Sequence, residues 1–151
     1  MPKSPTAILS AGSEGTDMAR PILIIEDDPD IAEVLRYSLE ALRFETRVAL
    51  TGTEGLSASL DKDRPPLLIL LDLLLPGMNG LEICRRVRRE PSTARIPIIM
   101  VTAKAAEVDF VSAKAAGVDD YVTKPFSVRK VMERISALLH PTEGGRSLKI
   151  L

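Results

Sequence analysis

The stretch LLILLDLLLPGMNG, residues 67–80, places a single carboxylate, Asp72, between two apolar runs. The run ahead of it, Leu67–Leu71, is short and apolar throughout, which is typical of a strand covered on both faces in a parallel sheet. The Pro-Gly pair and the later glycine indicate a tight loop before the next helix. A carboxylate between apolar residues is costly to desolvate unless a cation or hydrogen bonds meet it. Asp72 is therefore the first candidate functional residue.

Further segments on either side of this stretch have the composition of strands, and amphipathic segments separate them. Apolar residues in the amphipathic segments recur every three or four positions, as on one face of a helix. Asp30 is the expected cap of the first helix, and Val108, Val111 and Ala115 are the expected buried stripe of the fourth. We expect strands at Ile22–Ile25, Thr46–Leu50, Leu67–Leu71, Ile98–Val101 and Tyr121–Thr123. We expect helices at residues 29–42, 54–60, 81–91, 108–117 and 128–139.

Strands that alternate with helices predict an α/β fold, with a parallel sheet between two layers of helices. The 151 residues leave room for one domain, which we place at residues 20–140. Residues 1–19 are rich in small and polar types and are expected to be a disordered leader, with Met18 as an alternative start. Residues 141–151 are expected to be a short tail without an effector domain.

Composition and charge exclude several classes of function. Lys and Arg number 20 against 21 Asp and Glu, so the chain has no global excess of positive charge for direct nucleic-acid binding. One cysteine, Cys84, and one histidine, His140, exclude an intramolecular disulfide and a Cys/His zinc site. The longest apolar stretch is far shorter than the ~20 residues of a membrane helix, and no signal peptide is recognisable. We therefore expect a cytoplasmic protein that does not cross a membrane.

Polar side chains follow several of the expected strands at the point where each ends. Glu26 and Asp27 follow the first strand, Asp72 the third, Thr102 the fourth and Lys124 the fifth. Carboxyl ends of parallel strands meet at one edge of a sheet, so we expect these side chains to lie together. The carboxylates outnumber the ammonium group, and oxygen ligands with this excess of negative charge favour Mg²⁺. With lysine and hydroxyl groups for the phosphoryl oxygens, the set predicts a phosphoryl-transfer site in which Asp72 is the nucleophile.

Several motifs at the spacing of one family carry a resemblance to the receiver domains of two-component response regulators, the CheY-like superfamily. The motifs are ILIIEDDPD (residues 22–30), LLILLDLLLPGMNGLEICRRVR (67–88), IPIIMVTA (96–103) and AGVDDYVTKPFS (116–127). The resemblance covers about residues 20–140. It implies a flavodoxin-like (βα)5 fold, doubly wound, with a five-stranded parallel sheet in the order 2-1-3-4-5.

The resemblance also implies roles for the residues around the phosphate and the metal. Asp72 would be the phosphoacceptor, Asp27 a direct Mg²⁺ ligand, Glu26 a ligand mostly through water, and Leu74 the source of a backbone carbonyl for the metal. Asp28 is a third consecutive acid, so a metal pair shifted by one place stays open, as does a capping or solvated role for Glu26 and Asp27. Leu74 departs from the polar side chain of many family members, which leaves the lifetime of the phosphoryl group open.

A conformational switch is the second implication of the resemblance. Thr102 and Lys124 would contact the phosphoryl group, and the peptide bond between Lys124 and Pro125 is expected to be cis. Tyr121 would turn when Thr102 moves toward the phosphate, and a packed tyrosine that never moves is the alternative. The output surface would be the face formed by the fourth helix, the fifth strand and the fifth helix. Its charges resemble a set through which some receivers form homodimers, with a solvated face as the alternative. These charges are Asp119, Asp120, Arg129, Lys130 and Arg134.

We therefore predict a phosphorylation-dependent signalling switch that promotes only its own phosphorylation and dephosphorylation and is not an enzyme acting on a separate substrate. The expected partners are a sensor histidine kinase or phosphotransfer protein and a downstream protein target. The alternatives are a pseudo-receiver that binds a protein constitutively, a receiver fragment of a longer DNA-binding regulator, and an aspartyl phosphatase or flavin protein on this fold. Leu74 disfavours the phosphatase, which needs a second acid at that position. The arginines of residues 85–89 lack interleaved aromatics, which disfavours a nucleic-acid patch.

Overall fold

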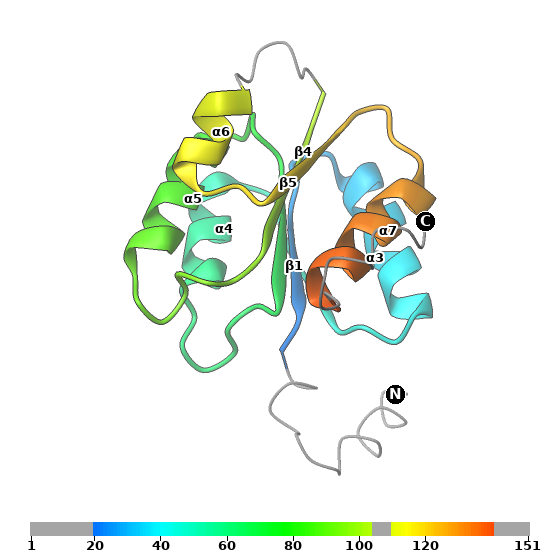
Figure 1. Cartoon of the computed structure of the whole chain (residues 1–151). Helices are drawn as coiled ribbons and strands as arrows, with labels where there is room; N and C mark the ends of the chain where they lie inside the picture. Colours follow the sequence, from blue (N-terminus) through cyan, green and yellow to red (C-terminus); the bar gives the residue numbers. More distant parts are fainter. Residues whose placement is uncertain (1–19, 104–109, 141–151) are drawn as a thin grey trace.

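A computed structural model describes residues 20–103 and 110–140 of the chain. They form a five-stranded parallel sheet in the order β2-β1-β3-β4-β5, with α4, α5 and α6 on one face and α3 and α7 on the other (Figure 1). This arrangement confirms the predicted fold. The strands are β1 (Ile22–Ile25), β2 (Thr46–Ala49), β3 (Leu68–Leu71), β4 (Ile98–Thr102) and β5 (Asp120–Thr123). The helices are α3 (Pro29–Ala41), α4 (Gly52–Ser59), α5 (Gly80–Arg89), α6 (Phe110–Ala116) and α7 (Val128–Leu139).

The inner strands β1, β3 and β4 are buried along their whole length, which is why their sequences are continuous apolar runs. Successive side chains of a strand point to opposite faces of the sheet. Leu23 and Ile25 therefore join the core that includes residues of α4, α5 and α6, whereas Ile22 and Ile24 join the core that includes residues of α3 and α7. Each fully buried Leu or Ile side chain stabilises the fold by about 1.5–3 kcal/mol. These two cores fix the strands whose carboxyl ends carry the candidate site.

The first helix is capped by a different residue from the one that the sequence predicts. Asp28, not Asp30, is the N-cap of α3, and its Oδ1 accepts hydrogen bonds from the amides of Asp30 (2.9 Å) and Ile31 (3.4 Å). Pro29 occupies the first helical position, where a backbone N–H would have no partner within the helix, so the proline loses no hydrogen bond there. The N-cap is therefore the residue before the proline. At the other end, Leu42 is the C-cap and is 56% exposed, although its spacing had assigned it to the buried face.

The prediction of the buried helix faces is wrong at several valine and alanine positions. Val34 of α3 is 48% exposed, Val111 of α6 is 71% exposed, and Ala115 is also exposed. Among the residues of α6 whose burial the structure describes, Ala113 and Ala116 are buried, and their small side chains let the helix lie close to its neighbours, whereas Val111 and Ala115 face solvent.

Some sequence predictions lie outside the described residues. These are the leader at residues 1–19, the tail at residues 141–151, and the burial of Val108. Among the helices that the structure describes, none is both long enough and apolar enough to cross a bilayer.

Candidate functional site

The carboxyl edge of the sheet brings together polar side chains from four strands. Glu26 follows β1 and Asp72 follows β3, and the amide of Asp72 donates to the carbonyl of Ile25 (3.0 Å), so the two acidic residues lie on adjacent strands. Thr102 ends β4 and Lys124 follows β5, and the amide of Lys124 donates to the carbonyl of Thr102 (2.7 Å). The parallel sheet thus brings residues nearly a hundred positions apart to one place.

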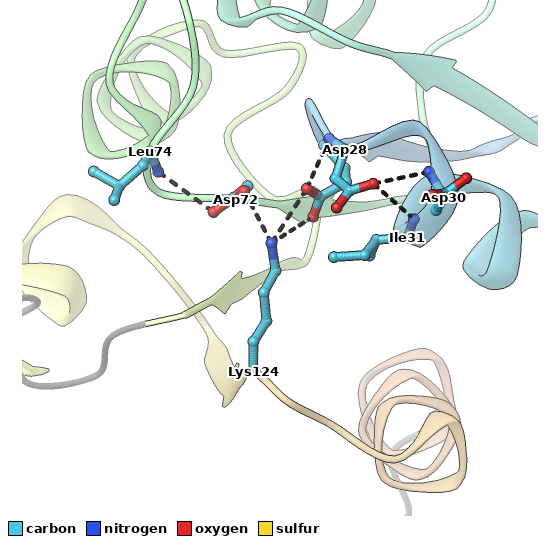
Figure 2. A network of polar contacts seen from close by, with 7 residues as sticks. Asp28, Asp30, Ile31, Asp72, Leu74 and Lys124 are labelled. Atoms are coloured by element: carbon cyan, nitrogen blue, oxygen red, sulfur yellow. Dashed lines mark hydrogen bonds and ion pairs between the residues drawn. The ribbon is translucent and has the colours of Figure 1, made fainter.

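Lys124 lies between two buried carboxylates. Its Nζ is 2.9 Å from Oε1 of Glu26 and 3.1 Å from Oδ2 of Asp72, and Figure 2 shows the lysine reaching from its strand toward Asp72. The side chains of Glu26 and Asp72 are 3% and 6% exposed, and that of Lys124 is 16% exposed. Charges so poorly solvated interact more strongly than charges in water. The lysine therefore offsets the repulsion between the two carboxylates.

Burial and pairing act against each other on the ionisation of this site. Burial alone lowers the pKa of Lys124, but the hydrogen bond to Glu26 and the charges of Asp72 and Glu26 outweigh burial, and the pKa lies above its ordinary value of 10.5. Burial raises the pKa of Glu26 above its ordinary value of 4.5, and the hydrogen bonds from Lys124 and the Asp28 amide offset this only in part. Lys124 is therefore charged throughout the neutral pH range.

Glu26, Asp27 and Asp72 form a group of oxygen atoms suited to a metal ion. One carboxylate oxygen from each lies within 4.8 Å of the other two, and Asp27 is exposed to solvent. Mg²⁺ takes oxygen ligands and keeps several waters, so a cluster with one open side fits this ion. The carboxylate of Asp28 is engaged in capping α3, where Figure 2 shows it facing Asp30 and Ile31. The geometry favours the pair Glu26 and Asp27 over the pair shifted by one place.

The loop after β3 brings the backbone of Leu74 to the same edge. The Leu74 amide lies 3.4 Å from Oδ1 of Asp72, to which it donates, and the Leu74 side chain is 54% exposed (Figure 2). Gly80, at the far end of this loop, lets the backbone come back into contact with the end of β3. Its amide donates to the carbonyl of Leu73 (2.9 Å), and a Cβ at this position would collide with the carbonyl oxygen of Asp72. This close approach holds the loop against the end of β3.

Thr102 provides a hydroxyl group with unused hydrogen-bonding capacity. Its side chain is fully buried, and within residues 20–103 and 110–140 its Oγ1 has no hydrogen-bond partner. Leaving a buried hydroxyl unpaired costs about 1–3 kcal/mol, so such a group indicates a partner that the described residues do not supply. The arrangement fits a ligand oxygen arriving beside β4.

The predicted switch tyrosine and the predicted cis peptide bond lie on the neighbouring strand β5 and in the loop after it. Tyr121 is half-buried, is paired in register with Met100 of β4, and packs against the core that includes residues of α4, α5 and α6. The peptide bond between Lys124 and Pro125 is cis. Tyr121 and Thr102 thus lie on adjacent strands, two steps apart along the β4–β5 ladder.

The sequence matches the model of the response regulator receiver domain over residues 22–136. The chain belongs to this family. It is 46% identical over 118 residues to the phosphate regulon transcriptional regulatory protein PhoB of Rhizobium meliloti (strain 1021), a match that covers 78% of this chain and 51% of PhoB. It is 41% identical over 126 residues to the DNA-binding response regulator MtrA of Mycolicibacterium smegmatis (strain ATCC 700084 / mc(2)155). This match covers 83% of this chain and 53% of MtrA.

A solved receiver domain with a similar fold contains a magnesium ion. The receiver domain of sensor histidine kinase PA1611 from Pseudomonas aeruginosa PAO1, with a magnesium ion coordinated in its active site cleft, is 28% identical, with a TM-score of 0.70. The match covers 80% of this chain and 98% of the PA1611 domain. By contrast, the receiver domain described here spans about half the length of the two curated relatives that it matches.

The residues that the sequence placed on the output face of this receiver domain fall into two groups. Asp120 at the start of β5 pairs with Arg134 of α7 (3.2 Å). A surface groove of about 400 Å³ lies beside this pair, and Lys130 and Arg134 are among its lining residues. Asp119 is not part of that face, because its carboxylate accepts a hydrogen bond from Arg88 (2.8 Å) at the amino end of the sheet. The two adjacent aspartates at the amino end of β5 are therefore held by different helices, Asp119 by α5 and Asp120 by α7.

Arg88 is the structural residue of this receiver domain that sequence reasoning missed. The sequence grouped it with the other arginines of residues 85–89, and Arg85 and Arg86 do pair with Glu82 on the surface of α5. The Arg88 side chain is instead only 20% exposed and is directed toward loops that precede β4 and β5. No local signal marks it, because its partners are brought to it by the fold.

Proposed function

We propose that the chain is a phosphorylation-dependent switch in which Asp72 accepts a phosphoryl group from a sensor histidine kinase or a phosphotransfer protein. The observation that carries this proposal is the buried carboxylate of Asp72, held 3.1 Å from Nζ of Lys124 and within 4.8 Å of the oxygens of Glu26 and Asp27. Acids grouped so closely are suited to a phosphoryl group whose charge is balanced by a cation. Membership of the receiver family supports the same reading.

The transfer forms one bond and breaks another. A carboxylate oxygen of Asp72 attacks the phosphorus, and the bond from phosphorus to the donor's histidine nitrogen breaks with its electron pair left on that nitrogen. The ammonium group of Lys124 offsets charge on the phosphoryl oxygens. Asp27, Asp72 and the carbonyl of Leu74 would hold Mg²⁺, with Glu26 acting mostly through water, and the ion would supply further charge neutralisation. The domain thus acts on its own carboxylate and not on a separate substrate.

The unpaired hydroxyl of Thr102 supplies the link from phosphorylation to output. In the proposed switch it donates a hydrogen bond to a phosphoryl oxygen, and its displacement leaves space into which Tyr121 turns. The face formed by α6, β5 and α7 then changes shape and binds a downstream protein or a second copy of the chain. The pair between Asp120 and Arg134 lies on this face, where an ion pair is available for exchange with a partner. A cytoplasmic location and the absence of direct nucleic-acid binding remain predictions.

The decisive test is phosphorylation by a small donor. We expect acetyl phosphate and Mg²⁺ to add one phosphoryl group to the native chain, seen as one mass increment in intact-mass spectrometry. Asp72→Asn should abolish the increment, while Asp63→Asn, which removes an exposed carboxylate elsewhere, should leave it unchanged. Labelling of Asp72→Asn at the native level would overturn the assignment, and absence of labelling in the native chain would favour a pseudo-receiver.

The role of this receiver in a longer protein is a separate proposal. The matched region makes up about half of each curated relative, and these relatives are named a transcriptional regulatory protein and a DNA-binding response regulator. A receiver that controls a DNA-binding domain is therefore the second candidate. In both candidates the residues at the carboxyl edge perform the same chemistry, so the phosphorylation test applies to either.

A further inference from the structure

Arg88 of α5 ties together two loops at the amino end of the sheet. Its Nε donates to the carbonyl of Gly117 (3.0 Å), and its Nη1 donates to the carbonyls of Ala94 (3.1 Å) and Ile96 (2.7 Å). Its Nη2 donates to Oδ2 of Asp119 (2.8 Å). The five donors of a guanidinium lie in a fixed plane, so several acceptors held at once restrict their relative positions. The residues before β4 and β5 are therefore fastened to one helix.

Asp119 extends the pairing of β4 with β5 beyond the strands themselves. Its amide donates to the carbonyl of Ile98 (2.9 Å), and its Oδ2 accepts from the amide of Ile98 (2.8 Å) as well as from Arg88. The hydrogen-bonded ladder that starts here ends at Thr102 and Lys124. The two switch residues, Thr102 of β4 and Tyr121 of β5, therefore belong to strands whose first residues are fixed at this point.

The same side chain fixes one end of α6. Gly117 ends the helix with φ 106°, and a Cβ there would lie 2.6 Å from Cγ of Arg88, so the glycine packs directly on the arginine. The thiol of Cys84 donates to the carbonyl of Ala116 (3.1 Å) and adds a second tie to α5. The C-terminal end of α6 is thus held by two side chains of α5.

We propose that Arg88 and Asp119 form the fixed anchor of the switch, a role that rests on the proposed function of Asp72 and Thr102. By holding the end of α6 and the start of β5 on α5, the pair keeps the backbone beside Tyr121 in place while the ends of these elements nearer the phosphate respond. A displacement of Thr102 then changes the position of Tyr121 relative to β4. Without the anchor, β5 and α6 follow the displacement as a whole, and less of it reaches the output face. Arg88 is thus a positioning residue at the opposite edge from the chemistry.

The test compares Arg88→Met with Arg89→Met, a matched loss of one arginine at an exposed neighbour on the same helix. Amide chemical shifts over residues 110–134 are measured with and without beryllium fluoride, a mimic of the phosphoryl group, at a temperature where each variant is folded. We expect Arg89→Met to give the native response and Arg88→Met to lower the shift change at Tyr121 to about half or less. Asp72 of Arg88→Met should still be labelled by acetyl phosphate, because the site itself is intact.

Further variants keep the proposal testable if Arg88→Met does not fold. Asp119→Asn retains the shape of the side chain and removes its charge, and it should lower the response in the same direction. Arg88→Lys keeps one charge with fewer directed donors and should restore part of the response. A full response in these variants overturns the anchor while leaving the proposed function in place. A native chain that gives no response at Tyr121, or no labelling at Asp72, overturns the proposed function instead.

Discussion

At the scale of single residues, formal charge explains why this edge of the sheet fits a cation and a phosphoryl group together. Glu26, Asp27 and Asp72 each contribute one negative formal charge, and Lys124 contributes one positive charge, so three minus one leaves two negative charges. A divalent cation balances this excess, and without it a dianionic phosphoryl group would meet like charge. Removing Lys124 would leave Glu26 and Asp72 as buried carboxylates without a counter-charge, which is unfavourable.

The side chain of Leu74 gives a residue-scale prediction about the lifetime of the phosphoryl group. Leu74 is exposed beside Asp72 and has no polar atom with which to orient an attacking water. We expect Leu74→Asn to speed hydrolysis of the phosphorylated protein roughly tenfold, because an amide can hold the water near the phosphorus. The decay of the phosphorylated species is followed by intact-mass spectrometry after the donor is removed. Leu50→Asn, the same exchange at another exposed leucine, should leave the decay unchanged. Equal decay in the native chain and Leu74→Asn would show that this position does not control lifetime.

At the scale of elements, the sequence predicts the strand bounds and the candidate residues at the strand ends more accurately than it predicts the buried faces of the helices. Predicted strand bounds differ from the observed ones by one residue or none. For the inner strands β1, β3 and β4 the reason is that strands buried on both faces are uninterrupted apolar runs. The candidate residues follow from the strand ends, since parallel strands share one functional edge. Spacing alone selected Val111 for the core, whereas the close packing of α6 buries Ala113.

Interactions between distant segments explain what sequence reasoning did not predict. The acceptors of Arg88 lie 6, 8, 29 and 31 residues away, and three of them are backbone carbonyls, which any residue type provides. The bond from Lys124 to Glu26 spans 98 residues, so its geometry depends on the order of the strands and not on a motif. Sequence pattern identifies which residues reach the edge, and the fold determines which of them touch.

The cap of α3 gives an element-scale prediction that separates structure from metal binding. Asp28→Ala removes the hydrogen bonds to the first amides of the helix and should lower the free energy of unfolding by about 1 kcal/mol. Its backbone amide remains to hold Glu26, so Mg²⁺ affinity should be unchanged. Asp27→Ala should show the opposite pattern, with weaker Mg²⁺ binding and little loss of stability, because its carboxylate is exposed. Urea unfolding and calorimetric Mg²⁺ titration measure the two effects. If Asp28→Ala loses Mg²⁺ as Asp27→Ala does, the metal pair is shifted by one place.

At the scale of the whole molecule, the sheet separates chemistry from recognition. The proposed phosphorylation site lies on the carboxyl edge, whereas the predicted output face is formed by one edge strand and the helices α6 and α7, which cover opposite faces of the sheet (Figure 1). The β4–β5 ladder connects the two, since it carries Thr102 at the site and Tyr121 toward the output face. In the proposed switch a signal crosses this single pair of hydrogen-bonded strands, so the hydroxyl of Thr102 is the point chosen to interrupt it.

The last prediction interrupts this connection without removing the phosphoacceptor. Thr102→Ala should leave Asp72 open to labelling by acetyl phosphate, because neither the carboxylates nor Lys124 depends on the hydroxyl, whose Oγ1 has no hydrogen-bond partner in the described part of the chain. Amide shifts over residues 117–134 on adding beryllium fluoride should nevertheless be much smaller than in the native chain, since nothing then draws β4 toward the phosphate. Thr123→Ala, at the exposed residue paired with Thr102 in the ladder, should give the native response. A native response in Thr102→Ala would mean that the output face is reached by another route, and loss of labelling would place the hydroxyl in the transfer step itself.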